Sequence, residues 1–395
     1  MPHRLRAVLF VLGLSAGFGY ESEAQIYTLP RVDPKSGDYF GGAAAIDGDR
    51  VLVGAAGVDT CGENSGAAYV YELEPESGRW RLEATLLPDE CEVGLFFGRT
   101  LDLSGNTAVV AAFPNAFSTI GSNAAYVFER DTTDGTWKQV ARLTGEPDRT
   151  EGPFAADVSV DGNRILVTTS GDLADGRFGG AAYVFERGDL GWTRSARLTA
   201  SGNTRAGILG GSARLDGDRF VVSASRYFGG GQGSVYVFDF NNDERRWRES
   251  ARLDGFEDFF ISTWIDGDRI IVGESKAGRE SDGRATVFRL DESGAWQREA
   301  VLRPTHPFSL GAFGSEVVVE GDRALVVGYD EQLEFSFNID RVVYVFEADD
   351  SWRQKHVIDI GSVYFGSAVD LDQGVAAIGQ VSDVEPGAVI VVQLH

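Results

Sequence analysis

The chain has 395 residues, with 50 glycines, 11 prolines and a formal net charge of −24. This acidity excludes the basic surface that nucleic-acid binding needs, and an apolar fraction of 43% excludes intrinsic disorder. Four histidines, two cysteines and one methionine leave little material for transition-metal or redox chemistry.

The N-terminal segment has the pattern of a secretory signal peptide. Arg4 and Arg6 form a basic start, residues 7–19 are apolar or small, and Ser22 and Ala24 are the small residues that a signal peptidase requires. The apolar stretch is too short to span a bilayer. We therefore expect residues 1–24 to be cleaved and the product to be secreted, periplasmic or extracellular, without membrane insertion. A buried N-terminal helix is the alternative.

A short turn recurs along the rest of the chain; it reads Asp-Gly-Asp/Asn in four copies and takes looser forms in the copies that begin at Ser104, Glu320 and Asp372. Its seven copies begin at positions 47, 104, 161, 216, 266, 320 and 372. In every copy an aromatic or leucine stands seven residues earlier: Phe40, Phe97, Phe154, Leu209, Phe259, Phe313 and Phe365. The regular spacing indicates seven repeats of one structural unit.

Each unit predicts four antiparallel strands, here named A to D. Strand A leads into the Asp-Gly turn and strand B leaves it, as in Val51–Gly54. Strand C carries motifs such as Ala125-Tyr126-Val127-Phe128, and strand D follows a tryptophan in six units. The segments are short, rich in β-branched and aromatic residues, and bounded by turn residues, which is typical of strands. Asp-Gly between two such segments is a hairpin signal.

Seven four-stranded units predict an all-β fold, a seven-bladed β-propeller formed by residues 25–395 as one domain. The last unit ends at His395 without a strand D, whereas Ile26–Leu29 precedes Phe40 with the spacing of a strand D. We expect this N-terminal strand to complete the last blade and close the ring. An open solenoid is the alternative, and it would leave both ends uncapped.

The Phe-Gly start of strand A, the Val53-Gly54-Ala55-Ala56 end of strand B and the Ala-Tyr-Val-Phe strand C resemble FG-GAP repeats. This resemblance implies the propeller found at the head of integrin α chains and in secreted bacterial proteins. Members of that family often bind calcium in the loop between strands A and B. Here the turn is only about two residues long and cannot wrap an ion that needs six to eight oxygens. We therefore expect no cofactor and no metal, and we interpret the turn acids as hairpin residues, with weak cation binding as the alternative.

Three further residue sets can be interpreted from the repeats. We expect the arginines that follow the turns to pair with the turn acids, and we interpret the repeated tryptophan as packing between blades, with a sugar-stacking ring as the alternative. Cys61 lies in the first B–C loop and Cys91 in the first D–A loop, on the same face of a propeller. An exported chain permits a disulfide between them, and two free buried thiols are the alternative.

The face formed by the B–C and D–A loops, here called the loop face, is the predicted binding surface. Its most irregular segments supply the candidate binding residues Phe113, Phe117, Arg226, Tyr227, Phe228, Phe256 and Phe260. Ordinary packing between blades is the alternative for these aromatics. The sequence contains no catalytic motif that we recognise, and we predict a non-catalytic binding or adhesion protein for an extracellular protein or glycan. A carbohydrate-binding lectin is the next hypothesis, and a propeller hydrolase or lyase the third, because fold does not determine function.

Overall fold

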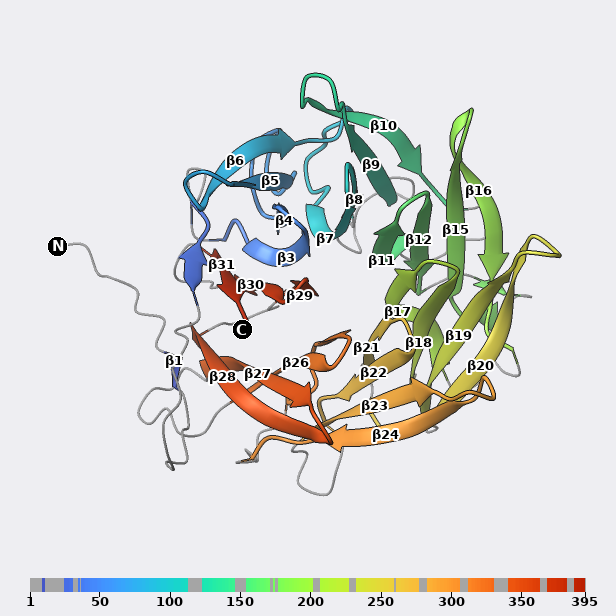
Figure 1. The fold of residues 1–395 in the computed structure, drawn as a ribbon. Coiled ribbons are helices and arrows are strands. Elements are labelled where there is room, and N and C mark those ends of the chain that lie inside the picture. Colours follow the sequence, from blue (N-terminus) through green and yellow to red (C-terminus); the bar gives the residue numbers. More distant parts are fainter. Residues whose placement is uncertain are drawn as a thin grey trace.

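The computed structural model describes residues 9–10, 25–30, 35, 37–112, 123–145, 154–170, 173–174, 177–201, 207–226, 232–258, 261–276, 283–305, 312–329, 340–362, 368–381 and 387–394. Within them the chain forms a ring of seven four-stranded antiparallel units around a central channel (Figure 1). This is the predicted seven-bladed β-propeller. Among these residues, no helix is long and apolar enough to cross a membrane.

The first four blades each run from the channel outward in chain order. Their strands are β3 (Phe40–Asp47), β4 (Arg50–Ala55), β5 (Ala67–Glu74) and β6 (Arg79–Leu86); β7 (Phe97–Ser104), β8 (Thr107–Ala112), β9 (Ala124–Arg130) and β10 (Trp137–Leu143); β11 (Phe154–Asp161), β12 (Arg164–Thr169), β15 (Ala181–Gly188) and β16 (Gly191–Leu198); β17 (Gly207–Asp216), β18 (Arg219–Arg226), β19 (Gly233–Asn241) and β20 (Arg246–Phe256). A two-stranded hairpin lies within the third blade's B–C connection: β13 (Leu173–Ala174) and β14 (Arg177–Phe178).

The last three blades follow the same order. Their strands are β21 (Ile261–Asp266), β22 (Arg269–Glu274), β23 (Arg284–Leu290) and β24 (Trp296–Leu302); β25 (Val317–Glu320), β26 (Arg323–Tyr329), β27 (Asp340–Ala348) and β28 (Trp352–Ser362); β29 (Val369–Asp372), β30 (Val375–Gln380) and β31 (Ala388–Gln393). A short strand, β1 (Leu9–Phe10), pairs with the outer edge of β28.

The N-terminal strand closes the ring as predicted. β2 (Ile26–Thr28) pairs antiparallel with β31, with Tyr27 opposite Val391, and supplies the fourth strand of the last blade. The pairing covers the open edge of β31, which would otherwise expose unpaired backbone groups. Termini at opposite ends of the chain thus share one sheet.

The hydrophobic core consists of layers between neighbouring blades. Each buried cluster combines residues of two successive blades, and the cluster that joins the last blade to the first contains Val389 and Phe40. Phe40 contacts the rings of Tyr69 and Tyr71 in its own blade, and Phe97 and Phe313 have equivalent aromatic partners. The repeated Phe therefore anchors strand A against strand C.

Two motif glycines meet where blades touch. A Cβ on Gly54 of β4 would lie 2.0 Å from the carbonyl oxygen of Gly98, which has a φ of +94° at the start of β7. Gly273 and Gly314 show the same contact two blades before the end of the ring, as do Gly379 and Gly41 at its closure. Backbones approach this closely only where no side chain intervenes, which explains both glycines of the repeat.

Candidate functional site

The innermost strand of every blade lines the central channel, which contains two cavities. The first, of about 170 Å³, lies toward the loop face and is here called the upper chamber. The second, of about 200 Å³, lies toward the A–B turns and is called the lower chamber. All seven blades contribute to both chambers, so each exists only in the closed ring.

Arg214 and Trp264 separate the two chambers, since both residues line each of them. They occupy the same position in neighbouring strands, two residues before the turns at Asp216 and Asp266. The guanidinium carbon of Arg214 lies 3.8 Å from the centroid of the Trp264 ring. At this distance the cation is attracted to the face of the indole.

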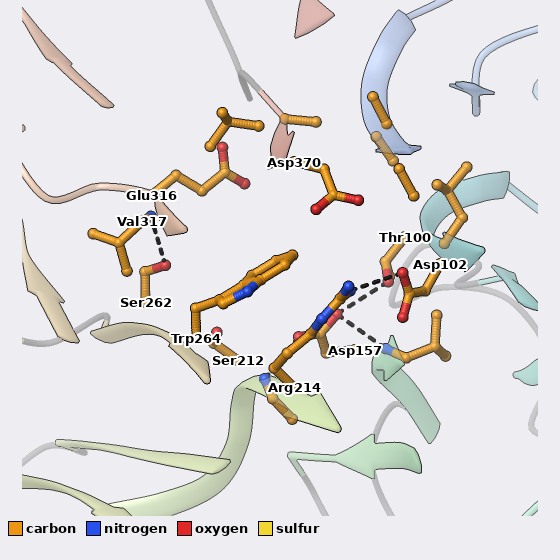
Figure 2. Close-up of a pocket in the computed structure, with 18 of the residues that line it drawn as sticks. Thr100, Asp102, Asp157, Ser212, Arg214, Ser262, Trp264, Glu316, Val317 and Asp370 are labelled. Atoms are coloured by element: carbon orange, nitrogen blue, oxygen red, sulfur yellow. Dashed lines mark hydrogen bonds and ion pairs between the residues drawn. The ribbon is translucent and has the colours of Figure 1, made fainter. Parts of the chain in front are cut away.

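Asp102 holds Arg214 in place from the second blade. Its carboxylate accepts a hydrogen bond from Arg214 Nη1 at 2.8 Å (Figure 2). It also accepts from Ser159 Oγ at 2.9 Å and from the backbone amide of Val160 at 2.7 Å. Only 1% of the Asp102 side chain is exposed. Burial by itself lowers the pKa of Arg214, but the charges of Asp102 and Asp370 outweigh burial and raise it. Arg214 therefore stays positively charged beside Asp102.

Polar side chains on the inner strands connect each blade to the next by one recurring hydrogen bond. A side-chain oxygen on the inner strand of one blade accepts a hydrogen bond from a backbone amide on the inner strand of the next blade. Counted relative to the turn of its own blade, the donating residue stands one position further along the chain than the accepting residue does. We call such a bond an inter-blade clasp. Near the loop face the acceptors are Asp157, Ser212 and Ser262, which bind the amides of Ala213, Thr263 and Val317.

The clasps repeat at two deeper levels of the channel. In the middle level Asp102, Ser159 and Asp370 accept from Val160, Leu215 and Ile46. At the turns, Asp47, Ser104, Asp161, Asp216, Asp266, Glu320 and Asp372 accept from the next turn around the whole ring. Inner strands of adjacent blades do not pair with each other, so these side chains satisfy backbone amides that would otherwise lack a partner.

The turn acids thus act between blades, and one expectation from the sequence is corrected. The arginines after the turns do not pair with the first acid of their own turns. Arg50 instead binds Glu72 at 2.7 Å and Glu83 at 3.2 Å in the outer strands of its blade, with Asp49 at 3.1 Å. The first turn acid is already engaged by the next blade, whereas the arginine side chain extends along the sheet toward strands C and D.

Three carboxyl groups of the upper chamber have raised pKa values. Burial raises the pKa of Asp157 to about 6, of Asp370 to about 7 and of Glu316 to about 8. Hydrogen bonds from backbone amides lower the pKa of Asp157 and Asp370 in part, and the charge of Arg214 also lowers that of Asp370. The positive charge of Arg341 lowers the pKa of Glu316, whereas the negative charges of Asp157 and Asp370 raise it.

Glu316 differs from the other acids of the upper chamber. Asp102, Asp157 and Asp370 all accept hydrogen bonds from the neighbouring blade, whereas Glu316 Oε2 is buried without a hydrogen-bond partner. In Figure 2 the Glu316 carboxyl points into the chamber on the same side of Trp264 as Asp370, opposite Arg214. Its chemistry is therefore not used by the fold.

The predicted disulfide is present and rigidifies the loop face of the first blade. Cys61 and Cys91 are joined, with their Cα atoms 5.9 Å apart. The two loops that they connect are also linked by backbone hydrogen bonds, from Gly94 N to Glu63 O at 2.8 Å and from Phe96 N to Asn64 O at 3.0 Å. Exposed on these loops are five acids, here called the acidic platform: Asp59, Glu63, Asp89, Glu90 and Glu92.

Most candidate loop residues from the sequence lie outside the described part of the chain: Phe113, Phe117, Tyr227, Phe228 and Phe260. Arg226 ends β18, and only its backbone is described. Phe256 is 3% exposed and its ring packs edge-on against Phe288, with centroids 6.2 Å apart. Phe256 thus belongs to the core between blades, because the end of β20 turns its side chain inward.

The repeated tryptophans pack between blades. The indole nitrogen of Trp137 donates to Glu83 at 3.2 Å, and that of Trp192 donates to Glu129 at 2.9 Å, in both cases in the preceding blade. These contacts agree with the interpretation of the repeated tryptophan as a residue that packs between blades. Trp264, the functional-site tryptophan, is not one of the repeated set, and sequence reasoning missed it together with Arg214 and Glu316.

The fold defines the class of the protein as a seven-bladed β-propeller. Residues 25–71 and 80–128 match the FG-GAP repeat family. These two matches and the ring of blades support the resemblance to FG-GAP repeat propellers. No group of three or more histidine, cysteine or acidic residues suited to hold a metal ion occurs among the described residues. No curated protein sequence matches the chain.

Solved structures share the architecture at low sequence identity. A candidate 6-phosphogluconolactonase from Bacteroides uniformis is 14% identical, with a TM-score of 0.51 over 82% of this chain and 86% of that one. The periplasmic gluconolactonase of Pseudomonas aeruginosa is 16% identical, with a TM-score of 0.49 over 82% and 86% of the two chains. Sqt1 of Saccharomyces cerevisiae is 8% identical, with a TM-score of 0.47 over 92% and 98%. Similarity at this level concerns the fold alone.

Proposed function

We propose that this protein is an exported, non-catalytic binding propeller that holds an extracellular protein with a basic surface on its loop face. The observation that supports this most is the acidic platform on two cross-linked loops. Loops fixed before binding lose less conformational freedom on association, so they favour affinity. A disulfide also fits an oxidising compartment such as the periplasm or the extracellular space, in line with the expected signal peptide.

The charge of the acidic platform indicates the chemistry of the partner. Residues 56–66 and 87–96 contain five acids and no lysine, arginine or histidine. Val93, 68% exposed, stands beside these acids as an apolar contact. A negative surface of this kind accelerates association with a positive one and repels other acidic proteins.

The inner-strand acids support a binding role more than a catalytic one. Asp102, Asp157 and Asp370 accept hydrogen bonds that connect blades. A proton transfer or bond formation at these carboxyl groups during a reaction would break those hydrogen bonds and disturb the ring. The indole nitrogens of Trp137 and Trp192 donate hydrogen bonds to the preceding blade, which supports a packing role over sugar stacking for those rings. Protein binding is therefore favoured over a lectin.

A charge-reversal experiment tests the proposal. We would measure the binding of a short oligolysine peptide, at several salt concentrations, to a variant with Glu63→Lys, Glu90→Lys and Glu92→Lys. The expected loss in affinity is roughly tenfold, with a weaker salt dependence. The matched control carries Asp243→Lys, Glu292→Lys and Asp350→Lys on exposed C–D turns at the opposite face and should bind nearly as the wild type does. Equal losses in both variants would refute a platform-specific site, and saturable binding on a glycan array would favour a lectin.

A further inference from the structure

The upper chamber carries a feature that neither the fold nor the proposed loop-face binding explains. Its inner wall places Glu316, whose buried Oε2 has no hydrogen-bond partner, in the same cavity as Asp370 and the ring of Trp264. The other charged pair of the wall, Arg214 with Asp102, is complete. A buried carboxyl oxygen without a hydrogen-bond partner is costly, and such groups require a specific explanation.

We propose that the upper chamber is a binding site for a small alkylammonium group, held between Glu316, Asp370 and the face of Trp264 that is turned away from Arg214. This site is independent of the proposed partner-binding function on the loop face.

Charge favours a cation in this place. Arg214 is neutralised by Asp102, so Asp157, Asp370 and Glu316 are the remaining acids of the chamber wall. Arg99 also lines the chamber, and the positive charge of Arg341 lowers the pKa of Glu316 without offsetting the effect of burial. Burial is the main cause of the raised pKa values of the three acids, and repulsion between neighbouring acids of the wall adds to it.

The aromatic ring narrows the ligand class. Trp264 has one face against Arg214, and Figure 2 shows Glu316 and Asp370 beyond its other side. Ammonium ions bind well to the face of an indole, and an aromatic ring combined with carboxylates is a recurring way to recognise alkylated amines. Ala43, Ala368 and Val369 supply apolar wall for the alkyl part.

The geometry favours an organic cation over a bare metal ion. Calcium requires six to eight oxygens at close range, and the acids of the chamber do not form a group suited to hold a metal. The cavity volume of about 170 Å³ accommodates a small molecule. An ammonium group can satisfy separate acceptors because it carries several donors on one nitrogen.

Isothermal titration of the full chain with n-butylammonium chloride tests the site. We expect saturable binding to the wild type, none for 1-butanol, and an affinity at least about tenfold lower for Glu316→Gln, which keeps shape but removes charge. Trp264→Leu should weaken binding as well, whereas Glu292→Gln, an exposed acid on a C–D turn, is the matched control and should not. Thermal unfolding of each variant establishes that the fold is retained.

Proton release gives a second measurement of n-butylammonium binding. Because a cation stabilises the ionised carboxylates, binding near pH 7 should release protons, and the measured heat should vary with the ionisation enthalpy of the buffer. Absence of n-butylammonium binding, equal affinity in Glu316→Gln, or equal binding of 1-butanol would overturn the proposal. Calcium binding that depends on Glu316 would show that the upper chamber is a metal site and not an alkylammonium site. Nα-acetyl-lysine amide, compared with the free amine, distinguishes a peptide side chain from a small molecule as the source of the ammonium group.

Discussion

Arg214 packs on Trp264 across the boundary between the fourth and fifth blades, with its guanidinium carbon 3.8 Å from the ring centroid. Each residue is the large member of an otherwise small or polar set of inner-strand residues at this level, namely Ala45, Asp102, Ser159, Val318 and Asp370. Together they divide the channel into two chambers, and the cation is fixed from the opposite side by Asp102.

Removal of this cation should destabilise the ring. In Arg214→Met the buried Asp102 carboxylate keeps its hydrogen bonds from Ser159 and Val160 but loses its counter-charge. Breaking a buried ion pair in this way costs about 3–5 kcal/mol. Urea unfolding would measure the loss against Arg79→Met, a variant of an exposed arginine. A loss no larger than that of the control would show that the pair does not stabilise the fold.

The inter-blade clasps predict a difference between two substitutions of one residue. Asp161 accepts a hydrogen bond from the amide of Gly217 at 2.6 Å. Asp161→Ala removes the acceptor and should cost about 1 kcal/mol, whereas Asp161→Asn retains an oxygen and should cost less. Chemical denaturation of both variants measures the difference. If alanine and asparagine are equally destabilising, the carboxylate acts by charge and not as an acceptor.

Stability should fall as pH rises across the neutral range because of the upper-chamber acids. The pKa of Glu316 is about 8 in the folded protein against an ordinary value of 4.5. The folded state therefore holds a proton that the unfolded state has released, so this contribution is fully present below about pH 4.5 and is lost as pH rises toward 8. Asp157 and Asp370 act in the same direction.

The variant Glu316→Gln isolates this effect. It cannot ionise, so its unfolding midpoint should change less between about pH 5 and pH 8 than that of the wild type, and the variant should be the more stable protein at pH 8. Thermal melts across this range measure the change. A parallel pH dependence of the two proteins would contradict the assignment of the raised pKa to Glu316.

The disulfide should contribute to stability and be detectable chemically. Cys61 and Cys91 are 30 residues apart, and closing a loop of this size corresponds to about 3–4 kcal/mol in the loop-entropy model. The double variant Cys61→Ser, Cys91→Ser should unfold at correspondingly lower denaturant concentration. Alkylation of the unfolded wild type should add mass only after reduction. Two adducts without reductant would exclude the bond.

Much of the fold was predictable from the chain because its repeats are local and regular. The turn acids, the Phe seven residues earlier and the strand C motif each recur at fixed spacing, so blade number and strand order follow from the sequence. The closing strand was also predictable, since Leu29 stands at the same distance from Phe40 as Leu86 does from Phe97. The role of the turn acids was not predictable, because each accepts a hydrogen bond from the turn of the next repeat and not from its own.

The site was decided by tertiary structure. Asp370 and Ile46 are separated by 324 positions and meet only because the ring closes. Likewise Asp102, Arg214 and Trp264 lie within inner strands and Glu316 lies just before one, and spacing within a repeat does not show which of them face one cavity. The sequence by itself determined a closed seven-bladed ring, whereas only the tertiary structure determined the chambers, because seven inner strands must converge before their side chains form a common wall.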